Sequence, residues 1–131
     1  MARLRTLRVK GLMEPISHFS DAVIAGRTLY VSGLVATNEH GDVIGAGDVV
    51  EQTRQIFGNL KRILDAAGAT PADVVKVTIF MRDVAQRPLI NPLRQEFFGP
   101  HRPASTLVEI SRLVRDDLLI EIEAVAQLPD A

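Results

Sequence analysis

Two glutamates near the C-terminus are the residues of this chain best suited to acid–base chemistry. Glu121 and Glu123 lie two positions apart in the segment IEIEAVA, whose alternation of apolar and polar residues is typical of a strand. Their side chains therefore point to the same face, with origins about 7 Å apart. Mutual repulsion and partial burial would raise a carboxyl pKa, which suits a general base or general acid near neutral pH. An exposed acidic strand face is the alternative interpretation, and the pattern alone leaves it open.

The other reactive residue types exclude several chemistries. The chain has no cysteine, which rules out thiolate nucleophiles, disulfides and cysteine-containing metal sites. His18, His40 and His101 show no helix-spaced ligand pair, so no metal site is predicted. The glycines of the segment NEHGDVIGAGD do not form a phosphate-binding fingerprint between a strand and a helix. His18 lies beside a predicted cleft segment, residues 17–23, as either a substrate contact or an ordinary loop residue.

Length and charge restrict the class of protein further. A chain of 131 residues is predicted to form one domain, spanning residues 1–131. Fifteen basic and sixteen acidic residues give a net charge of -1, so nucleic acid is not an expected partner. The basic N-terminal segment lacks the apolar run of a secretory signal, and no apolar segment approaches the roughly 20 residues that span a bilayer. We therefore expect a soluble, cytoplasmic protein without membrane contact.

The elements that must position the glutamates follow a simple order. A long helix is predicted from Asp48, as its N-cap, to about Ala67, with Gly68 as a left-handed cap. A second helix is predicted to start with Asn91 as N-cap and Pro92 at its first position. Strands are predicted for residues 22–26, 28–35, 74–81, 105–110 and 118–126. The order is therefore β-β-α-β-α-β-β, and Leu4, Leu7 and Val9 also have the pattern of a strand.

Two helices can cover only one face of such a sheet. The other face is predicted to carry Leu119 and Val125 beside the two glutamates, and Val74 and Phe80 on a neighbouring strand. These residues are too apolar to lie wholly in water. A partner subunit is the simplest cover, so we expect self-association with the candidate chemistry close to a subunit boundary.

Several short segments resemble one family in both order and spacing. They are SDAV at residues 20–23, YVSGL at 30–34, QTRQIFGNLKRILDAAGAT at 52–70, VVKVTIFMRD at 74–83, PAS at 103–105 and IEIEAVA at 120–126. Each segment is weak evidence alone. Together they resemble the RidA family of reactive enamine/imine intermediate deaminases, also called the YjgF family, across nearly the whole chain.

The resemblance implies an α+β, chorismate-mutase-like fold, with a mixed sheet and two helices on one face. It also implies a homotrimer with three clefts at the subunit interfaces. The implied activity is the hydrolysis of amino-acid-derived enamines and imines, such as 2-aminoacrylate and 2-iminobutanoate, to a 2-keto acid and ammonia without a cofactor. In that family the arginine after Pro-Ala clamps the substrate carboxylate, and the first glutamate of the IEIEA segment positions or activates water.

The candidate site residues follow from the family motifs. The resemblance assigns water activation to Glu121 and places Asn91 and Ser32 in the substrate-binding cleft. Four further cleft positions depart from the family pattern: Ser105 stands in place of the arginine, Leu107 in place of a frequent cysteine, Phe19 in place of a frequent tyrosine, and Leu34 in place of a glutamine. The cleft is therefore predicted to be altered, with small-molecule binding retained.

The missing arginine leaves two functions open. A bidentate arginine–carboxylate contact is worth about 1.5 to 3 kcal/mol, and Ser105 supplies only one neutral hydrogen bond. The chain is then either a deaminase with a non-standard metabolite or a non-catalytic, small-ligand-binding or regulatory trimer. Arg102, three residues upstream, is either a substitute for the missing charge or a surface charge. Endoribonuclease activity, attributed to some relatives, is a weaker third option because the charge is balanced.

Overall fold

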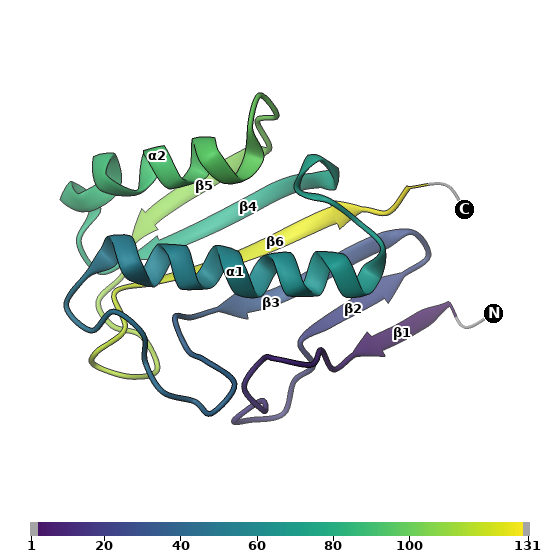
Figure 1. The fold of residues 1–131 in the computed structure, drawn as a ribbon, viewed down its shortest axis with the longest axis horizontal. Helices are drawn as coiled ribbons and strands as arrows, with labels where there is room; N and C mark the ends of the chain where they lie inside the picture. The colour runs from purple at the N-terminus through teal and green to yellow at the C-terminus, as the bar shows by residue number, and fades with distance from the viewer. Residues whose placement is uncertain (1–2, 130–131) are drawn as a thin grey trace.

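Two helices cover one face of a six-stranded sheet in the computed structural model, which describes residues 3–129 (Figure 1). The elements are β1 (Leu4–Leu7), β2 (Ala22–Ala25), β3 (Thr28–Leu34), α1 (Val49–Ala67), the short 3₁₀ helix η1 (Pro71–Asp73), β4 (Val74–Met81), the 3₁₀ helix η2 (Val84–Gln86), α2 (Arg87–Phe98), β5 (Ala104–Glu109) and β6 (Ile120–Gln127). The sheet order is β1-β2-β3-β6-β4-β5, with β4 and β5 parallel and the other neighbours antiparallel. The predicted α+β class is confirmed, and β1 adds one strand to the predicted order.

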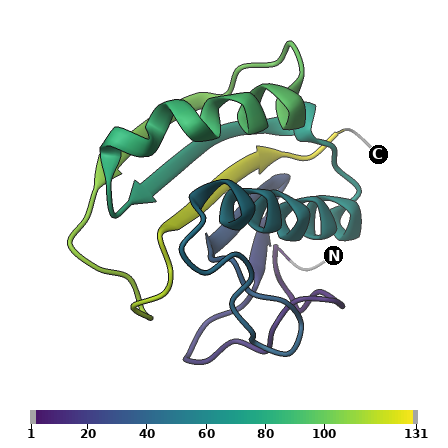
Figure 2. The same cartoon turned by 60° about the vertical axis from the view of Figure 1, so that its left-hand side comes forward.

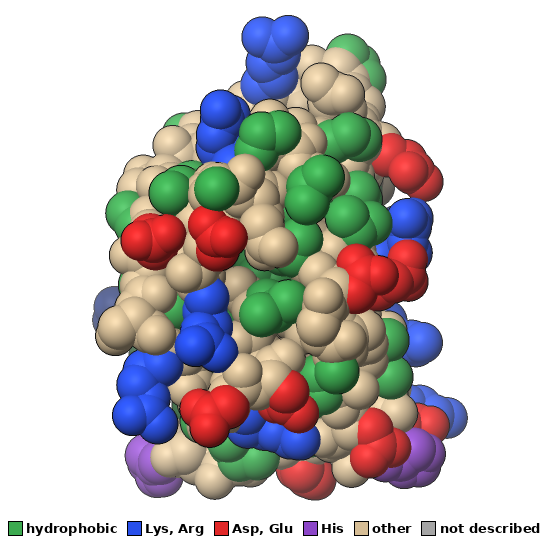
Figure 3. Space-filling model, turned by 90° about the vertical axis from the view of Figure 1, so that its left-hand side faces the viewer, with side chains coloured by type: hydrophobic (Ala, Val, Ile, Leu, Met, Phe, Trp, Pro, Cys, Tyr) green, Lys and Arg blue, Asp and Glu red, His purple; other side chains and the backbone are tan. Residues whose placement is uncertain are grey.

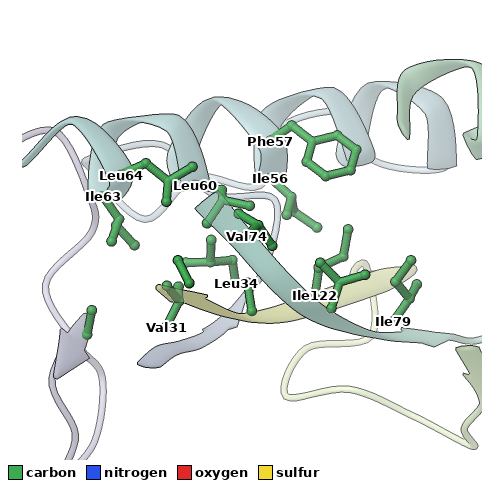
Figure 4. Packing of buried hydrophobic residues seen from close by; sticks show 14 of the residues in the cluster. Val31, Leu34, Ile56, Phe57, Leu60, Ile63, Leu64, Val74, Ile79 and Ile122 are labelled. Atoms are coloured by element: carbon green, nitrogen blue, oxygen red, sulfur yellow. The ribbon is translucent and has the colours of Figure 1, made fainter. Parts of the chain in front are cut away.

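The long helix α1 has the boundaries that its sequence signals predict. The carboxylate of Asp48 accepts hydrogen bonds from the backbone N–H groups of Val50 and Glu51, at 3.0 and 3.2 Å. Gly68 ends the helix in the left-handed conformation, with φ of 75°, which glycine adopts without a steric penalty. The buried side chains of α1 point onto the strands beneath (Figure 4). Each large one contributes about 1.5 to 3 kcal/mol of transfer free energy.

The second helix begins earlier than predicted, so the assignment of Asn91 as its N-cap is wrong. Asn91 lies inside α2, and η2 directly precedes the helix. The carboxylate of Asp83 caps η2, and Pro88 is the second residue of α2, in the first turn, where its missing N–H breaks no helical hydrogen bond. Ile90 is fully buried and Leu93 lies on the same helix face three residues later, so the extra turn adds an apolar contact to the core. Figure 2 shows α2 lying along β4 and β5, beside α1.

A bulge in β4 corrects a second expectation. The pairing of β4 with β6 shifts between Val74 and Lys76, which leaves Val75 as an extra residue. Val74 therefore turns to the helix-covered face and is fully buried near α1, instead of lying on the open face (Figure 4). The rest of β4 keeps the predicted alternation, with Val77, Ile79 and Met81 buried.

The face of the sheet opposite the helices stays open in the single chain. Phe80 and Val125 are half-buried there, and Tyr30 exposes 51% of its surface. Neither helix of the described residues, α1 or α2, is long and apolar enough to cross a membrane. The open face is thus apolar at several points, as the alternation in the sequence predicts.

One buried glutamine connects α1 to two of the loops at the end of the sheet. Gln52 is fully buried, and its Oε1 accepts the backbone N–H of Leu119 at 2.8 Å. Its Nε2 donates to the carbonyl oxygens of Asp117 at 2.8 Å and of Gly45 at 3.2 Å. The side chain therefore satisfies three backbone groups and fixes the approach to β6.

We predict that Gln52→Leu lowers the free energy of unfolding by about 1 to 3 kcal/mol, because it leaves the half-buried N–H of Leu119 without a partner. Chemical denaturation in urea measures the change. Gln95→Leu, on the exposed surface of α2, is the matched control and should change stability by less than about 0.5 kcal/mol. Equal effects of the two substitutions would contradict the structural role of Gln52.

Candidate active-site cavity

A β-bulge in β3 makes room for the side chain of Glu121. Val31 pairs with Ala124 and Leu34 pairs with Ile122, so Ser32 and Gly33 together oppose a single residue of β6. A Cβ atom at Gly33 would lie 2.8 Å from the carboxyl carbon of Glu121, closer than real Cβ contacts allow. The absence of a side chain at Gly33 thus permits the carboxylate to lie against the β3 backbone.

The Glu121 carboxylate lies at the edge of a cavity of about 420 Å³. Most of the lining side chains are apolar. The lining residues belong to the loop before β2, to β3 and the segment after it, to α1, and to β6 and the loop before it: Leu12, Met13, Pro15, Ile16, Ser17, Phe19, Asp21, Ser32, Gly33, Leu34, Val35, Thr37, Asn59, Val114, Arg115, Leu118 and Glu121. Ile16, Phe19 and Val114 expose 60%, 48% and 63% of their surface. At the end of the molecule where β6 begins, hydrophobic side chains reach the surface among charged ones (Figure 3).

The two acidic residues of the cavity differ in their partners. The carboxylate of Asp21 accepts a hydrogen bond from Arg8 at 2.9 Å and one from the backbone N–H of Val9 at 2.7 Å. Glu121 makes no hydrogen bond or ion pair within residues 3–129. Asp21 therefore holds the loop in place, whereas Glu121 is available to a ligand or a water molecule.

The environment of Glu121 raises its pKa. Burial contributes most, because it disfavours the charged form, and the nearby negative charge of Glu123 adds to the shift. The repulsion by Glu123 is the cause that the spacing of the two glutamates predicts, and the burial is already present in the single chain. A carboxyl group whose pKa is raised toward neutrality is a stronger base than an ordinary glutamate once it has ionised.

The predicted cleft residues Ser32, Leu34 and Phe19 line the same cavity as Glu121. The hydroxyl of Ser32 donates to the carbonyl oxygen of Ser20 at 2.5 Å, so it also anchors the loop that covers the cavity. Its lone pairs are left for a ligand. His18 is exposed and stands between two lining residues of that loop.

The other predicted site residues form a second group near α2. Ser105 and Leu107 pair with the buried residues Val77 and Ile79 of β4, so their side chains point to the helix-covered face. Asn91 lines an open groove of about 540 Å³ between α2 and the segment that precedes β5. Arg102 also lines this groove, and Leu107 packs against the core.

The single chain does not bring these two groups together. In the sheet, Glu121 is in register with Phe80, and Phe80 with Val108, which places Val108 about 10 Å from Glu121. Ser105 lies three residues before Val108, roughly another 10 Å along β5, and on the opposite face. A metabolite of a few heavy atoms cannot contact Glu121 and Ser105 of one chain.

Three residues that line the cavity or the groove were not predicted from the sequence: Gly33, Asn59 and Arg94. The apolar positions of β3 at Leu29, Val31 and Leu34 break the period of two, and that break was the available signal for the bulge at Gly33. The helical pattern of α1 gave no signal for Asn59. Its amide donates to the carbonyl oxygen of Thr37 at 3.0 Å, and the residue lines the cavity. Arg94 lies one helical turn after Asn91 and lines the same groove, beside Ser105. Once a helix is assigned to this segment, the spacing of three residues places Arg94 on the same helix face as Asn91.

The fold is that of the chorismate-mutase-like α+β proteins, and comparisons with known proteins give the family. The profile described as endoribonuclease L-PSP matches residues 10–128. The chain belongs to this family, which is the RidA or YjgF family. The crystal structure of the YjgF gene product of E. coli is similar to this structure, with a TM-score of 0.85 and 34% sequence identity. The match covers 94% of this chain and 98% of the E. coli chain.

Sequence relatives include proteins with named deaminase activities. A RutC family protein of Pyrococcus horikoshii is 42% identical over 113 residues, which are 86% of this chain and 89% of that protein. The 3-aminoacrylate deaminase RutC of Acinetobacter baylyi is 39% identical over 119 residues, 91% of this chain and 94% of that protein. The 2-iminobutanoate/2-iminopropanoate deaminase of Dermatophagoides farinae is 36% identical over 112 residues, 86% of this chain and 87% of that protein.

We predict that Glu121 titrates at higher pH than an ordinary glutamate and that Glu123→Gln lowers its pKa, because the substitution removes a nearby negative charge. NMR titration of the side-chain carboxyl carbons of glutamate measures both values. Glu96→Gln, on the exposed surface of α2, removes a distant charge and should leave the Glu121 titration unchanged. A Glu121 pKa in the ordinary range would contradict the burial argument.

Proposed function

We propose that this protein hydrolyses an enamine or imine of a small metabolite to a carbonyl compound and ammonia, with Glu121 activating the water. The observation that carries the proposal is the unpartnered, half-buried carboxylate against Gly33 in a largely apolar cavity. The names of two relatives support it, since both are called deaminases of compounds in this chemical class.

The proposed reaction needs one group that accepts and returns a proton. An enamine first tautomerises to the imine, and the carboxylate of Glu121 then takes a proton from water as the oxygen attacks the imine carbon. The same proton passes to the nitrogen of the resulting carbinolamine. The carboxylate of Glu121 then takes the hydroxyl proton of the carbinolamine and delivers it to the nitrogen, so that the C–N bond breaks, ammonia leaves and the C=O bond of the product forms. The balanced result is imine plus water giving a carbonyl compound plus ammonia, with no cofactor.

The proposed site is a cleft between subunits of a homotrimer. The support is geometric: the Glu121 group and the Ser105 group lie on opposite faces of one sheet, so a small ligand can reach both only if a neighbouring chain supplies one of them. A cyclic trimer places the edge strand of one subunit against the cavity of the next. The open sheet face, with Tyr30, Phe80 and Val125, is the apolar surface that such a trimer would cover. Light scattering after size exclusion would reject the proposal if it showed only monomer.

The substrate we propose is not the standard one of the family. The support is the set of changed residues, since Ser105 replaces the family's arginine and Phe19, Leu34 and Leu107 make the cleft more apolar. Loss of catalysis is the second candidate, because the same changes remove family contacts, and the experiment below distinguishes the two. We do not propose RNA cleavage, because a net charge of -1 supplies no field for a polyanion.

Glu121→Gln is expected to reduce kcat by about a hundred-fold or more, because it removes the proton acceptor. Imines generated in situ from several amino acids by a dehydratase or an oxidase provide the panel of substrates, and keto-acid release is the measurement. Burial raises the Glu121 pKa, so ionisation of this carboxyl group lowers the free energy of unfolding as the pH rises through that pKa. Glutamine carries no such charge, so the variant should be at least as stable as the wild type at neutral pH. A wild type that binds the products but hydrolyses no imine would favour the non-catalytic alternative.

Gly33→Ala is expected to reduce activity while the fold is retained. The added methyl group would displace the flexible end of the Glu121 side chain from the bulge. Gly58→Ala is the matched control, since nothing lies within 4 Å of a Cβ atom at this exposed helix position. The control should keep full activity and gain about 0.5 to 1 kcal/mol of stability. If both variants keep full activity, the close approach of Gly33 to Glu121 has no catalytic role.

A further inference from the structure

The guanidinium group of Arg94 reaches Ser105, the position at which the family's arginine is missing. Arg94 projects from α2, and its terminal nitrogen Nη2 donates a hydrogen bond to the Ser105 Oγ at 2.8 Å. The side chain is half-buried. A positive charge is therefore present beside residue 105, although it comes from a helix and not from strand β5.

No carboxylate neutralises this charge within the described chain. Arg94 forms no ion pair among residues 3–129, and its hydrogen bond to Ser105 uses one of its five N–H donors. Burial, and then the positive charge of Arg87, lower the pKa of Arg94 from its usual value. A half-buried guanidinium without a counter-ion is costly, and a bound anion would relieve that cost.

The surroundings of Arg94 are shaped to admit a small anion. Arg94 lines the open groove of about 540 Å³ together with Asn91, which lies three residues earlier on the same helix face. The amide of Asn91 can donate to an oxygen atom that the guanidinium also binds, and the hydroxyl of Ser105 can do the same. A planar guanidinium fork matches the two oxygens of a carboxylate.

We propose that Arg94 of helix α2, and not a residue of strand β5, binds the carboxylate of the substrate in this protein. The proposal rests on the proposed function for the identity of the reacting group, but not for the binding of the carboxylate. Ser105 then has a defined role: its small side chain leaves space for the Arg94 guanidinium and fixes its direction through the hydrogen bond. An arginine at position 105 would fill that space with a second positive charge.

Arg102 is the competing candidate for the same role. It lines the groove but is exposed, and it forms no ion pair or hydrogen bond within the described chain. An exposed arginine loses more side-chain freedom on binding and gains less from a well-hydrated anion. Arg94 is half-buried and already oriented by Ser105, so it binds an anion at lower cost.

The experiment compares two ligands that differ only in charge. Isothermal titration calorimetry measures binding of 2-oxobutanoate and of its neutral amide, 2-oxobutanamide, to the purified wild type and to Arg94→Gln, Arg94→Lys and Arg94→Gln/Ser105→Arg. Arg54→Gln is the matched control, because it removes the same charge from an exposed position on α1. Circular dichroism and thermal melting confirm that each variant is folded.

The wild type is expected to prefer the oxoacid, and Arg94→Gln is expected to weaken oxoacid binding by about ten- to a hundred-fold without changing amide binding. Arg94→Lys should retain part of the preference, since it keeps the charge but not the fork. The double variant should recover part of it, because the guanidinium returns on residue 105. Arg54→Gln should bind both ligands like the wild type.

Two results would overturn the proposal: a wild type without preference for the oxoacid, or an Arg94→Gln variant that loses both ligands equally, as a merely structural bond would predict. Keto-acid release from in situ imines separates this proposal from the proposed function. A wild type that prefers the oxoacid but releases no product supports Arg94 and refutes hydrolysis. A wild type that hydrolyses a carboxylated imine with a kcat/KM that Arg94→Gln does not change refutes Arg94 and supports hydrolysis.

Discussion

The close approach of the Glu121 carboxylate to the backbone of β3 is the constraint on which the site depends. Two residues of β3 oppose one residue of β6 at this point, and Gly33 has no Cβ atom that would displace the carboxylate. The same bulge shifts the pairing register of β3 by one residue and so returns Leu34 to the core, where its side chain also forms part of the cavity wall. Burial against β3 then raises the Glu121 pKa. The bulge at Gly33 is therefore the common cause of the β3 backbone geometry, the packing of Leu34 and the raised pKa of Glu121.

Polar side chains elsewhere keep the cavity open by fixing its loops. The Arg8–Asp21 pair and the hydroxyl of Ser32 hold the loop before β2, and Gln52 holds the loop before β6. Each of these groups is satisfied by hydrogen bonds, so it adds directional constraint without a large desolvation cost. Glu121 and Arg94 differ from them, because each is partly buried and forms no ion pair within the described chain. Both charges lie where the proposed chemistry needs them.

Local signals predicted much of this fold, and non-local geometry explains the exceptions. The cap at Asp48, the glycine at 68 and the alternation around Glu121 depend on a few neighbouring residues, and the structure agrees with each of them. The start of α2 was misplaced because Asn91 followed by proline has the pattern of a cap, while the burial of Ile90 extends the helix by a turn. Bulges depend on how strands pair, so neither the reversal of Val74 nor the division of the site residues between two sheet faces could be derived from residue spacing. The contact between Arg94 and Ser105 could not be derived from the sequence, because it forms only when α2 packs on β5.

The most direct test of a cleft shared between subunits is complementation between two inactive variants. Glu121→Ala removes the group proposed to activate water, and Arg94→Glu reverses the charge proposed to bind the carboxylate. In the proposed cyclic trimer the two groups of each cleft come from different chains. Co-expression with two affinity tags and purification of the mixed trimers allows keto-acid release to be measured. A shared cleft predicts that each variant alone is inactive and that every purified mixed trimer has one restored cleft, or about a third of its clefts. Mixed trimers that remain as inactive as the separate variants would contradict a site formed by Glu121 of one subunit and Arg94 of the next.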